Sequence, residues 1–109
     1  MPPISPAPSR NTAPVRSRSG IWPVTRGLAW TGEAWSDYLY WQTQDRKTLK
    51  RINALIADSL RTPFTGIGKP EALRENLSGF WSRRIDDSNR LVYAVDDKHL
   101  TIISCRYHY

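Results

Sequence analysis

Few side chains in this sequence are of the types that carry out chemistry. The chain has two histidines and one cysteine, and it ends in CRYHY at 105–109. Cys105 and His108 are three residues apart, so on a strand they would point to opposite faces, and His99 lies near the turn before that strand. Ligands dispersed in this way do not make a zinc site, and we expect neither a metal ion nor a cofactor. Cys105 follows an apolar run, so we expect it to pack in the core rather than to act as a nucleophile.

Arginines on the β-type segments favour the binding of a phosphodiester, because a guanidinium group binds phosphate through paired hydrogen bonds. The arginines in question are Arg83, Arg84, Arg90 and Arg106. If four residues form the turn before Arg90, then Arg83 shares a face of the sheet with Arg90. A three-residue turn at 96–98 would bring Ser104, Arg106 and His108 to that face, whereas a two-residue turn would place His108 on the opposite face. The spacing therefore allows a cationic cluster with one imidazole and does not require it.

The elements that must position these side chains begin with two helices. The first begins at Thr31 or Gly32 and continues to about residue 44, with apolar residues at three- and four-residue spacing. Asp45 can cap a second helix from about 46 to 60, which carries a clear apolar stripe and stops before Pro63. Two consecutive amphipathic helices predict a helical hairpin, whose apolar stripes must both be covered.

Segments with strand character surround and follow the helices. They lie at 27–30, 71–76, 80–85, 90–95 and 100–107, and the segment at 71–76 is the weakest. Turns of hairpin length separate the last three, so consecutive strands should pair in antiparallel fashion. The sequence therefore predicts an α+β domain in which the helical hairpin packs on an antiparallel β-sheet.

Composition divides the chain into an extension and one domain. Residues 1–25 are rich in Pro, Ser and Arg and have little to bury, so we expect them to be disordered, whereas 26–109 form the domain. Each part carries +3 of the net charge of +6, and a mildly basic domain permits a polyanionic partner without demanding one. No apolar run could span a bilayer or form a signal peptide, and a single cysteine suits a reducing cytosol. We therefore expect a cytoplasmic protein with no membrane partner.

From about residue 28 to 109, the sequence closely resembles the YoeB-type toxins of the RelE/ParE superfamily. The most specific matches are the segments RTPFTGIGKPE, NLSGFWSRRI, RLVYAV and the terminal CRYHY. The resemblance implies the α+β fold and a ribosome-dependent endonuclease that cuts mRNA in the A site. It also implies neutralisation by a YefM-like antitoxin and the formation of a homodimer. Val24 lies just before the first matching residues, which suggests a mis-set start codon upstream of it.

By motif matching, the resemblance also implies roles for single residues. Glu71 of GKPE would be the general base, Arg90 of RLVYAV would stabilise charge on the phosphoryl group, and His108 of CRYHY would be the general acid. Substrate contacts would come from Tyr109, Arg84 and Lys69. These types suit RNA cleavage by the neighbouring 2′-hydroxyl, which needs a base for its proton, a cation for the growing charge and an acid for the leaving oxygen.

Two other functions stay open at this point. A non-catalytic binder of the RelE/ParE fold, such as a gyrase inhibitor or an operon co-regulator, would keep the fold without the acid, base and cation. A general basic nucleic-acid-binding module is a third reading, but the charge is modest and no recognised motif is present. The intact CRYHY segment favours the enzyme.

Overall fold

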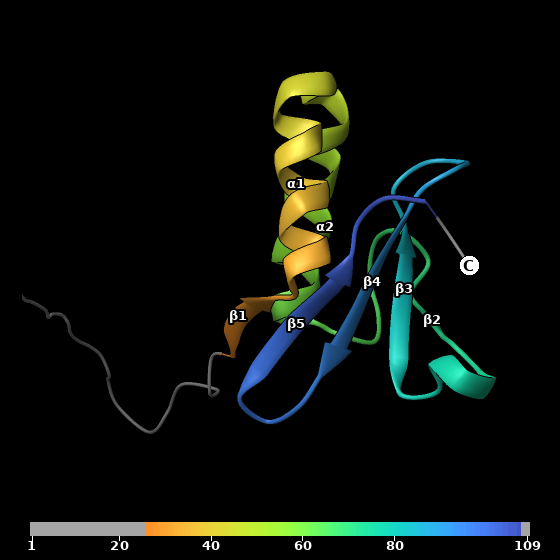
Figure 1. The fold of residues 1–109 in the computed structure, drawn as a ribbon. Helices are drawn as coiled ribbons and strands as arrows, with labels where there is room; N and C mark the ends of the chain where they lie inside the picture. The colour runs from red at the N-terminus through yellow and green to blue at the C-terminus, as the bar shows by residue number, and fades with distance from the viewer. Residues whose placement is uncertain (1–25, 108–109) are drawn as a thin grey trace, which may run out of the picture.

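The computed structural model describes residues 26–107, which form a helical hairpin and a five-stranded sheet (Figure 1). The expected disordered extension at 1–25 and two predicted site residues, His108 and Tyr109, lie outside the described residues. The strands follow the order β1-β5-β4-β3-β2, and the helices pack on one face of the sheet. The predicted α+β fold with its helical hairpin is confirmed. Within residues 26–107, neither helix is long and apolar enough to cross a membrane.

Capping side chains set the boundaries of both helices. α1 spans Gly32–Gln44 and α2 spans Arg46–Arg61, so both agree with the predicted ranges to within one residue. The Thr31 hydroxyl accepts a backbone N–H bond at the start of α1, and the Asp45 carboxylate accepts two at the start of α2. α2 ends before Pro63, because the residue before a proline disfavours the helical conformation.

The strands are β1 (Gly27–Trp30), β2 (Glu71–Ala72), β3 (Phe80–Arg84), β4 (Arg90–Val95) and β5 (His99–Ser104). β2 to β5 form the predicted antiparallel meander. β1 instead pairs with β5 in parallel, so the sheet is mixed rather than wholly antiparallel. No local signal sets this pairing, because the two strands lie at opposite ends of the domain sequence. The segment at 71–76 is a strand only at its first two residues and continues into a 3₁₀ turn at Glu75–Leu77.

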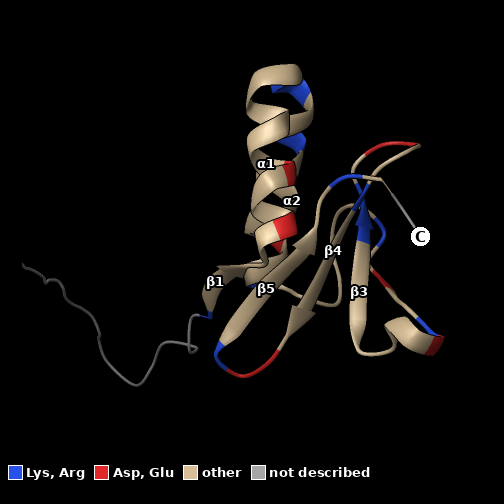
Figure 2. Ribbon diagram, viewed as in Figure 1, with Lys and Arg blue, Asp and Glu red and all other residues tan. Residues whose placement is uncertain are grey.

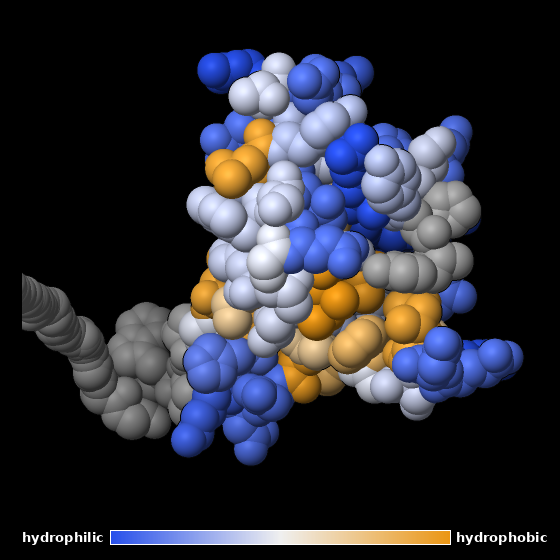
Figure 3. All heavy atoms as spheres, viewed as in Figure 1, coloured by the Kyte–Doolittle hydropathy of each residue, from blue (hydrophilic) through white to orange (hydrophobic). Residues whose placement is uncertain are grey.

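The core lies between the helices and the sheet face that they cover. It is formed by buried apolar side chains from α2, β4 and β5, among them Ile52, Leu55, Leu91, Tyr93, Leu100 and Ile102. Successive strand residues point to opposite faces, so the alternate residues of β3 and β4 point away from the helices. Figure 3 shows apolar side chains gathered over the lower part of the strands, with hydrophilic side chains around them.

Arg83 of β3 is the largest fully buried side chain, and it holds the loop that follows α2. Its guanidinium donates to the Asp58 carboxylate at 2.6 Å and its Nε donates to the Tyr93 hydroxyl at 3.0 Å. The remaining bonds, at 2.6–3.0 Å, go to the carbonyl oxygens of Thr62, Thr65 and Ile67. These bonds use all five N–H donors of the guanidinium. They tie the loop to α2 and to the sheet, and so fix the path of the chain toward β2.

Asp58 of α2 is the anionic partner in this buried network. One carboxylate oxygen accepts from Arg83 and from the Ile67 amide, and the other accepts from Arg61 at 2.7 Å. The hydrogen bond from Arg83, followed by that from the Ile67 amide, lowers the pKa of Asp58 below its ordinary value. The network therefore contains an ionised pair whose hydrogen-bonding groups are satisfied.

Gly66 lies in this loop and is expected to be sensitive to substitution. Its φ of +117° favours glycine, and a Cβ at this position would collide with the Asp58 carboxylate. We expect Gly66→Ala to lower the free energy of unfolding by about 1–3 kcal/mol. Gly32→Ala is the matched control, because a Cβ there meets nothing within 4 Å and alanine favours the helix. Urea denaturation measures both variants, and equal midpoints would contradict this account of the loop.

Candidate active site

The sheet register brings three predicted site residues onto the face opposite the helices. Glu71 of β2 pairs with Ser82 of β3, and Ser82 pairs with Val92 of β4. Arg84 and Arg90 pair with each other two residues away along the same two strands. Paired residues share a face, and so do alternate residues along a strand. Glu71, Arg84 and Arg90 therefore lie on one face of the sheet.

The spacing of Glu71 and Arg90 leaves room for a substrate group. They lie two strand spacings apart across the sheet and two residues apart along the strands. Their Cα atoms are therefore about 12 Å apart. Glu71 is exposed and Arg90 is half-buried, and no ion pair joins them. A carboxylate and a guanidinium held apart on one face can contact the same phosphodiester from two sides.

Arg84 and Arg90 place two guanidinium groups directly across from each other. The Arg90 amide donates to Tyr107 rather than to β3, so this is a non-hydrogen-bonded pair, in which Cα atoms are about 4.5 Å apart. Within residues 26–107, no carboxylate forms an ion pair with either arginine. Arg90 instead donates to the carbonyl oxygens of Asp86 at 2.6 Å and Asn89 at 3.0 Å. Like charges placed opposite each other destabilise a sheet, and a bound anion would relieve that repulsion.

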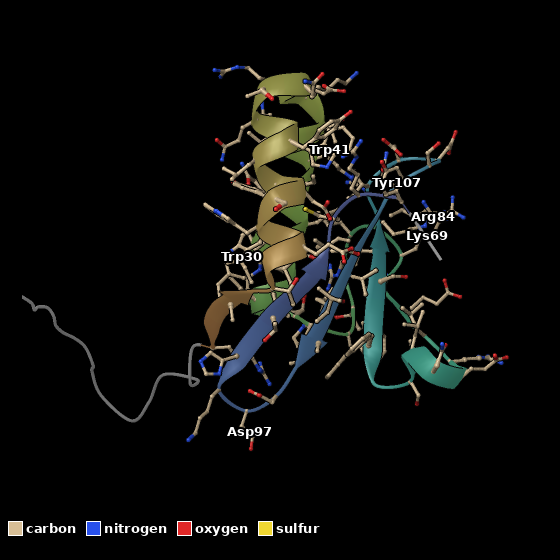
Figure 4. All side chains as sticks on the ribbon, in the orientation of Figure 1. Trp30, Trp41, Lys69, Arg84, Asp97 and Tyr107 are labelled. Atoms are coloured by element: carbon tan, nitrogen blue, oxygen red, sulfur yellow. The ribbon has the colours of Figure 1, made fainter. Side chains whose placement is uncertain are left out.

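Main-chain hydrogen bonds bring Lys69 and Tyr107 to this arginine pair. The Arg84 amide donates to the Gly68 carbonyl at 2.6 Å, and the Arg90 amide donates to the Tyr107 carbonyl at 2.7 Å. Lys69 and Tyr107 have φ angles of +52° and +66°, which are uncommon for residues with a side chain and gather at functional sites. Figure 4 shows Lys69, Arg84 and Tyr107 at the same end of the sheet, and Figure 2 shows basic residues there.

A cleft of about 220 Å³ borders this end of the sheet. It lies between α2 and the turn after β3, and it is lined by Lys47, Thr48, Arg51, Ile85 and Asp86. The Arg51 guanidinium donates to the Arg84 carbonyl at 3.1 Å. Arg51 of α2 therefore contacts the backbone of the residue that carries one of the paired guanidinium groups.

The structure corrects the predicted arginine cluster. Arg84, and not Arg83, shares a face with Arg90, because five residues rather than four separate the paired positions. Arg83 pairs with Leu91, and its side chain is buried on the opposite face. Neither predicted length for the next turn is right, since four residues separate paired Val95 and Leu100. A bulge then shifts the register, so that Ser104 pairs with Val92 on the Arg90 face.

Arg106 does not join the face of Arg90, contrary to the prediction for a three-residue turn, and Cys105 does not lie there either. Arg106 lies beyond β5, and its guanidinium stacks over the ring of Tyr40, 3.5 Å from the centroid. Cys105 is buried in the core, as predicted, and burial raises the pKa of its thiol to about 12. A thiol of this kind is not a nucleophile at neutral pH. Among residues 26–107, no three His, Cys, Asp or Glu side chains are grouped as metal ligands would be.

Asn89 is a residue of this site that the sequence prediction does not include. Its Oδ1 accepts a hydrogen bond from the Tyr107 amide at 2.7 Å, and its Nδ2 donates to the Asp86 carboxylate at 3.0 Å. The DDSN segment indicates a turn, and asparagine side chains in turns commonly bond to the backbone. Nothing local indicates that Asn89 would reach a residue 18 positions away.

Comparison with known proteins supports a family for this site. The sequence model of a family described as a YoeB-like toxin of bacterial type II toxin-antitoxin system matches residues 30–109. Toxin YoeB of Escherichia coli strain K12 is 62% identical over 82 residues, which cover 75% of this chain and 98% of that protein.

Two solved structures from Staphylococcus aureus are also similar. The YoeB dimer has 46% identity and a TM-score of 0.74, covering 78% of this chain and 99% of that one. The YoeB-YefM complex has 46% identity and a TM-score of 0.71, covering 77% of this chain and 98% of that one. Together with the match over residues 30–109, these likenesses show that the chain belongs to the YoeB family of bacterial type II toxins.

Proposed function

We propose that this toxin is an endoribonuclease that cleaves mRNA in the ribosomal A site by general acid and base catalysis. The observation that carries the proposal is the placement of Glu71, Arg84 and Arg90 on one face of the sheet, opposite the helices. A carboxylate beside two guanidinium groups can take up a proton next to a bound phosphodiester. The family membership supports the same chemistry, since the motifs that carry these residues are the ones that the resemblance rests on.

In the proposed reaction, the 2′-oxygen of the mRNA attacks the adjacent phosphorus. Glu71 takes the proton of the 2′-hydroxyl while the new O–P bond forms, and Arg90 meets the charge that grows on the phosphoryl oxygens. His108 donates a proton to the 5′-oxygen as its bond to phosphorus breaks. The products are a 2′,3′-cyclic phosphate and a free 5′-hydroxyl, so no water molecule is consumed in this step.

The other predicted site residues would hold the substrate. Arg84 lies directly across from Arg90, and Lys69 follows the residue whose carbonyl binds the Arg84 amide. Both can contact phosphates on either side of the scissile one. Tyr109 completes the set as a substrate contact. A site built from these groups binds RNA mainly through its phosphates, so binding should weaken as the salt concentration rises.

The proposed protein partners follow from the solved relatives. YoeB of S. aureus is described as a dimer and in complex with YefM, and we extend both properties to this chain. Trp35 and Leu39 of α1, 46% and 43% exposed, offer apolar surface for such partners. The ribosome is the third proposed partner, and its use as the site of cleavage places the toxin in the cytoplasm.

Mapping of RNA ends tests the proposed function. The purified toxin is added to a defined mRNA, either free or bound to ribosomes that hold a chosen codon in the A site. We expect cleavage within that codon, with 5′-hydroxyl ends, only when ribosomes are present. Cleavage of free RNA at the same rate would contradict ribosome dependence. Intact mRNA in both samples would favour the non-catalytic binder instead.

A further inference from the structure

The chain leaves the sheet at Cys105, and side chains of α1 hold it there. β5 ends at Ser104, so the peptide groups of Cys105 lie beyond the strand ladder. The Asp37 carboxylate accepts a hydrogen bond from the Cys105 amide at 3.1 Å. The Trp41 indole donates to the Cys105 carbonyl at 2.8 Å. Two side chains of one helix therefore satisfy both backbone groups of a single residue.

These contacts follow one face of α1. Ala34, Asp37 and Trp41 are spaced by three and four residues, so they lie in a row along the helix. The Cys105 thiol packs against Ala34, with Sγ 3.7 Å from the Ala34 carbonyl oxygen. Ala34 and Cys105 are fully buried and Trp41 is nearly so. Cys105 is thus held at three points, two on its backbone and one on its thiol, by a helix that also forms the core.

The next two residues run from α1 to the arginine pair. The Tyr107 amide donates to Asn89 at 2.7 Å, and the Tyr107 carbonyl accepts from the Arg90 amide at 2.7 Å. Between these anchors, the Arg106 guanidinium stacks over the Tyr40 ring of α1. Residues 105–107, which we call the strap, therefore connect α1 to the first residue of β4.

The charged form of the Asp37 carboxyl is energetically unfavourable at this position. Burial, together with the nearby charge of Glu33, raises the pKa of its carboxyl above the ordinary value, and the Cys105 amide and Arg106 only partly oppose this effect. The environment of Asp37 is therefore less favourable to its charged form than water is. A smaller or apolar residue would avoid this cost, but it would leave the Cys105 amide without its acceptor.

We propose that Asp37 and Trp41 are positioning residues, which hold the strap in the register that carries it to Arg90. Arg90 lies on the sheet face that it shares with Glu71 and Arg84, which we call the arginine face. The proposal rests on the proposed RNA cleavage, because it assigns these residues a role in the rate of that reaction. They act through the backbone of Cys105 and touch no substrate. Releasing the strap would shift Tyr107 relative to Arg90, whose amide donates to the Tyr107 carbonyl. A displacement of about 1 Å can lower a catalytic rate by about 10²-fold.

The test compares Asp37→Ala with the conservative Asp37→Asn, whose amide oxygen can accept the same hydrogen bond. We expect Asp37→Ala to lower the single-turnover rate of A-site cleavage by about 10²-fold, with ribosome affinity unchanged. Asp37→Asn should restore most of the rate. Trp41→Phe should resemble Asp37→Ala, because it removes the indole donor and keeps an aromatic ring. Gln42→Ala is the matched control, since it removes an exposed polar side chain of α1 that forms no hydrogen bond to the strap.

Hydrogen exchange at the Cys105 amide supplies a second measurement that does not depend on catalysis. We expect faster exchange in Asp37→Ala than in the wild type, Asp37→Asn or Gln42→Ala, while antitoxin binding shows that each variant is folded. Exchange that is unchanged in Asp37→Ala, or faster exchange with an unchanged cleavage rate, would overturn the positioning role. If the wild-type toxin itself leaves mRNA intact, the proposed function fails, and that result is separate from the exchange measurement.

Discussion

Replacing Arg90 with alanine is expected to slow cleavage of A-site mRNA by about 10²–10³-fold. Arg90 lies across from Arg84 and shares its face with Glu71. Its loss removes the cation that meets charge growing on the phosphoryl oxygens, and this interaction is stronger in the transition state than in the ground state. Single-turnover cleavage at saturating toxin measures the effect on the chemical step rather than on binding to the ribosome.

Lys98→Ala is the matched control for this substitution. Lys98 is exposed in the turn between β4 and β5, at the opposite end of β4 from Arg90, so its removal changes the net charge by the same amount away from the arginine face. Its cleavage rate should stay close to that of the wild type. Both variants should remain folded, because the Arg90 side chain bonds only to the carbonyl oxygens of Asp86 and Asn89. Equal rates in the two variants would contradict the role of Arg90.

Replacing Arg83 with methionine should have the largest effect on stability, lowering the free energy of unfolding by about 3–5 kcal/mol. Methionine fills much of the same space and donates no hydrogen bonds. The change would leave the Asp58 carboxylate without its closest cation, which now lies at 2.6 Å. It would also leave the carbonyl oxygens of the loop at 62–67 without their donors. Chemical denaturation followed by fluorescence measures the loss.

Arg84→Met provides the comparison, because it makes the same change at the next residue of β3. The Arg84 side chain is exposed, so we expect a change of no more than about 0.5 kcal/mol. The two substitutions should therefore have different effects: Arg83→Met should lower stability, and Arg84→Met should weaken substrate binding. Similar losses in both variants would mean that the buried network does not hold the loop.

Local chemistry is sufficient to predict the helices of this domain. Thr31 and Asp45 are short polar residues that accept amide hydrogen bonds at a helix start, and Pro63 excludes the helical conformation from the residue before it. These signals act within four residues, so they can be read directly from the sequence. The strand segments at 80–85 and 90–95 are also clear, because polar turn residues separate them.

Register could not be predicted in the same way, and it decides which arginines form the site. Arg83 and Arg84 are chemically identical neighbours. Only the pairing of β3 with β4 places Arg83 in the core and Arg84 on the opposite face of the sheet. One residue of slip would exchange them. The bulge that places Ser104 beside Val92 depends on contacts across the sheet, and so does the parallel pairing of β1. Such contacts join residues far apart in the sequence and leave no local pattern.

The proposed roles of Glu71 and Lys69 could be predicted only from the family resemblance, for a related reason. An exposed glutamate beside a lysine is an ordinary surface feature, and its sequence neighbours do not distinguish it. The structure adds that Glu71 shares a face with the arginine pair. It also adds the strap contacts of Asp37 and Trp41, which apolar periodicity along α1 could not indicate, because periodicity reports burial and not hydrogen bonding.

The position of β5 in the sheet governs when the protein can fold. β5 is the last strand along the chain, yet it lies between β1 and β4 and supplies Leu100 and Ile102 to the core. During synthesis, β1 and the helical hairpin emerge well before β5, the strand on which they pack. β5 is made some seventy residues after β1, since Gly27 pairs with His99. Pairing over such a separation is slow to form. The nascent chain therefore completes its sheet and strap only after residue 107 has been made.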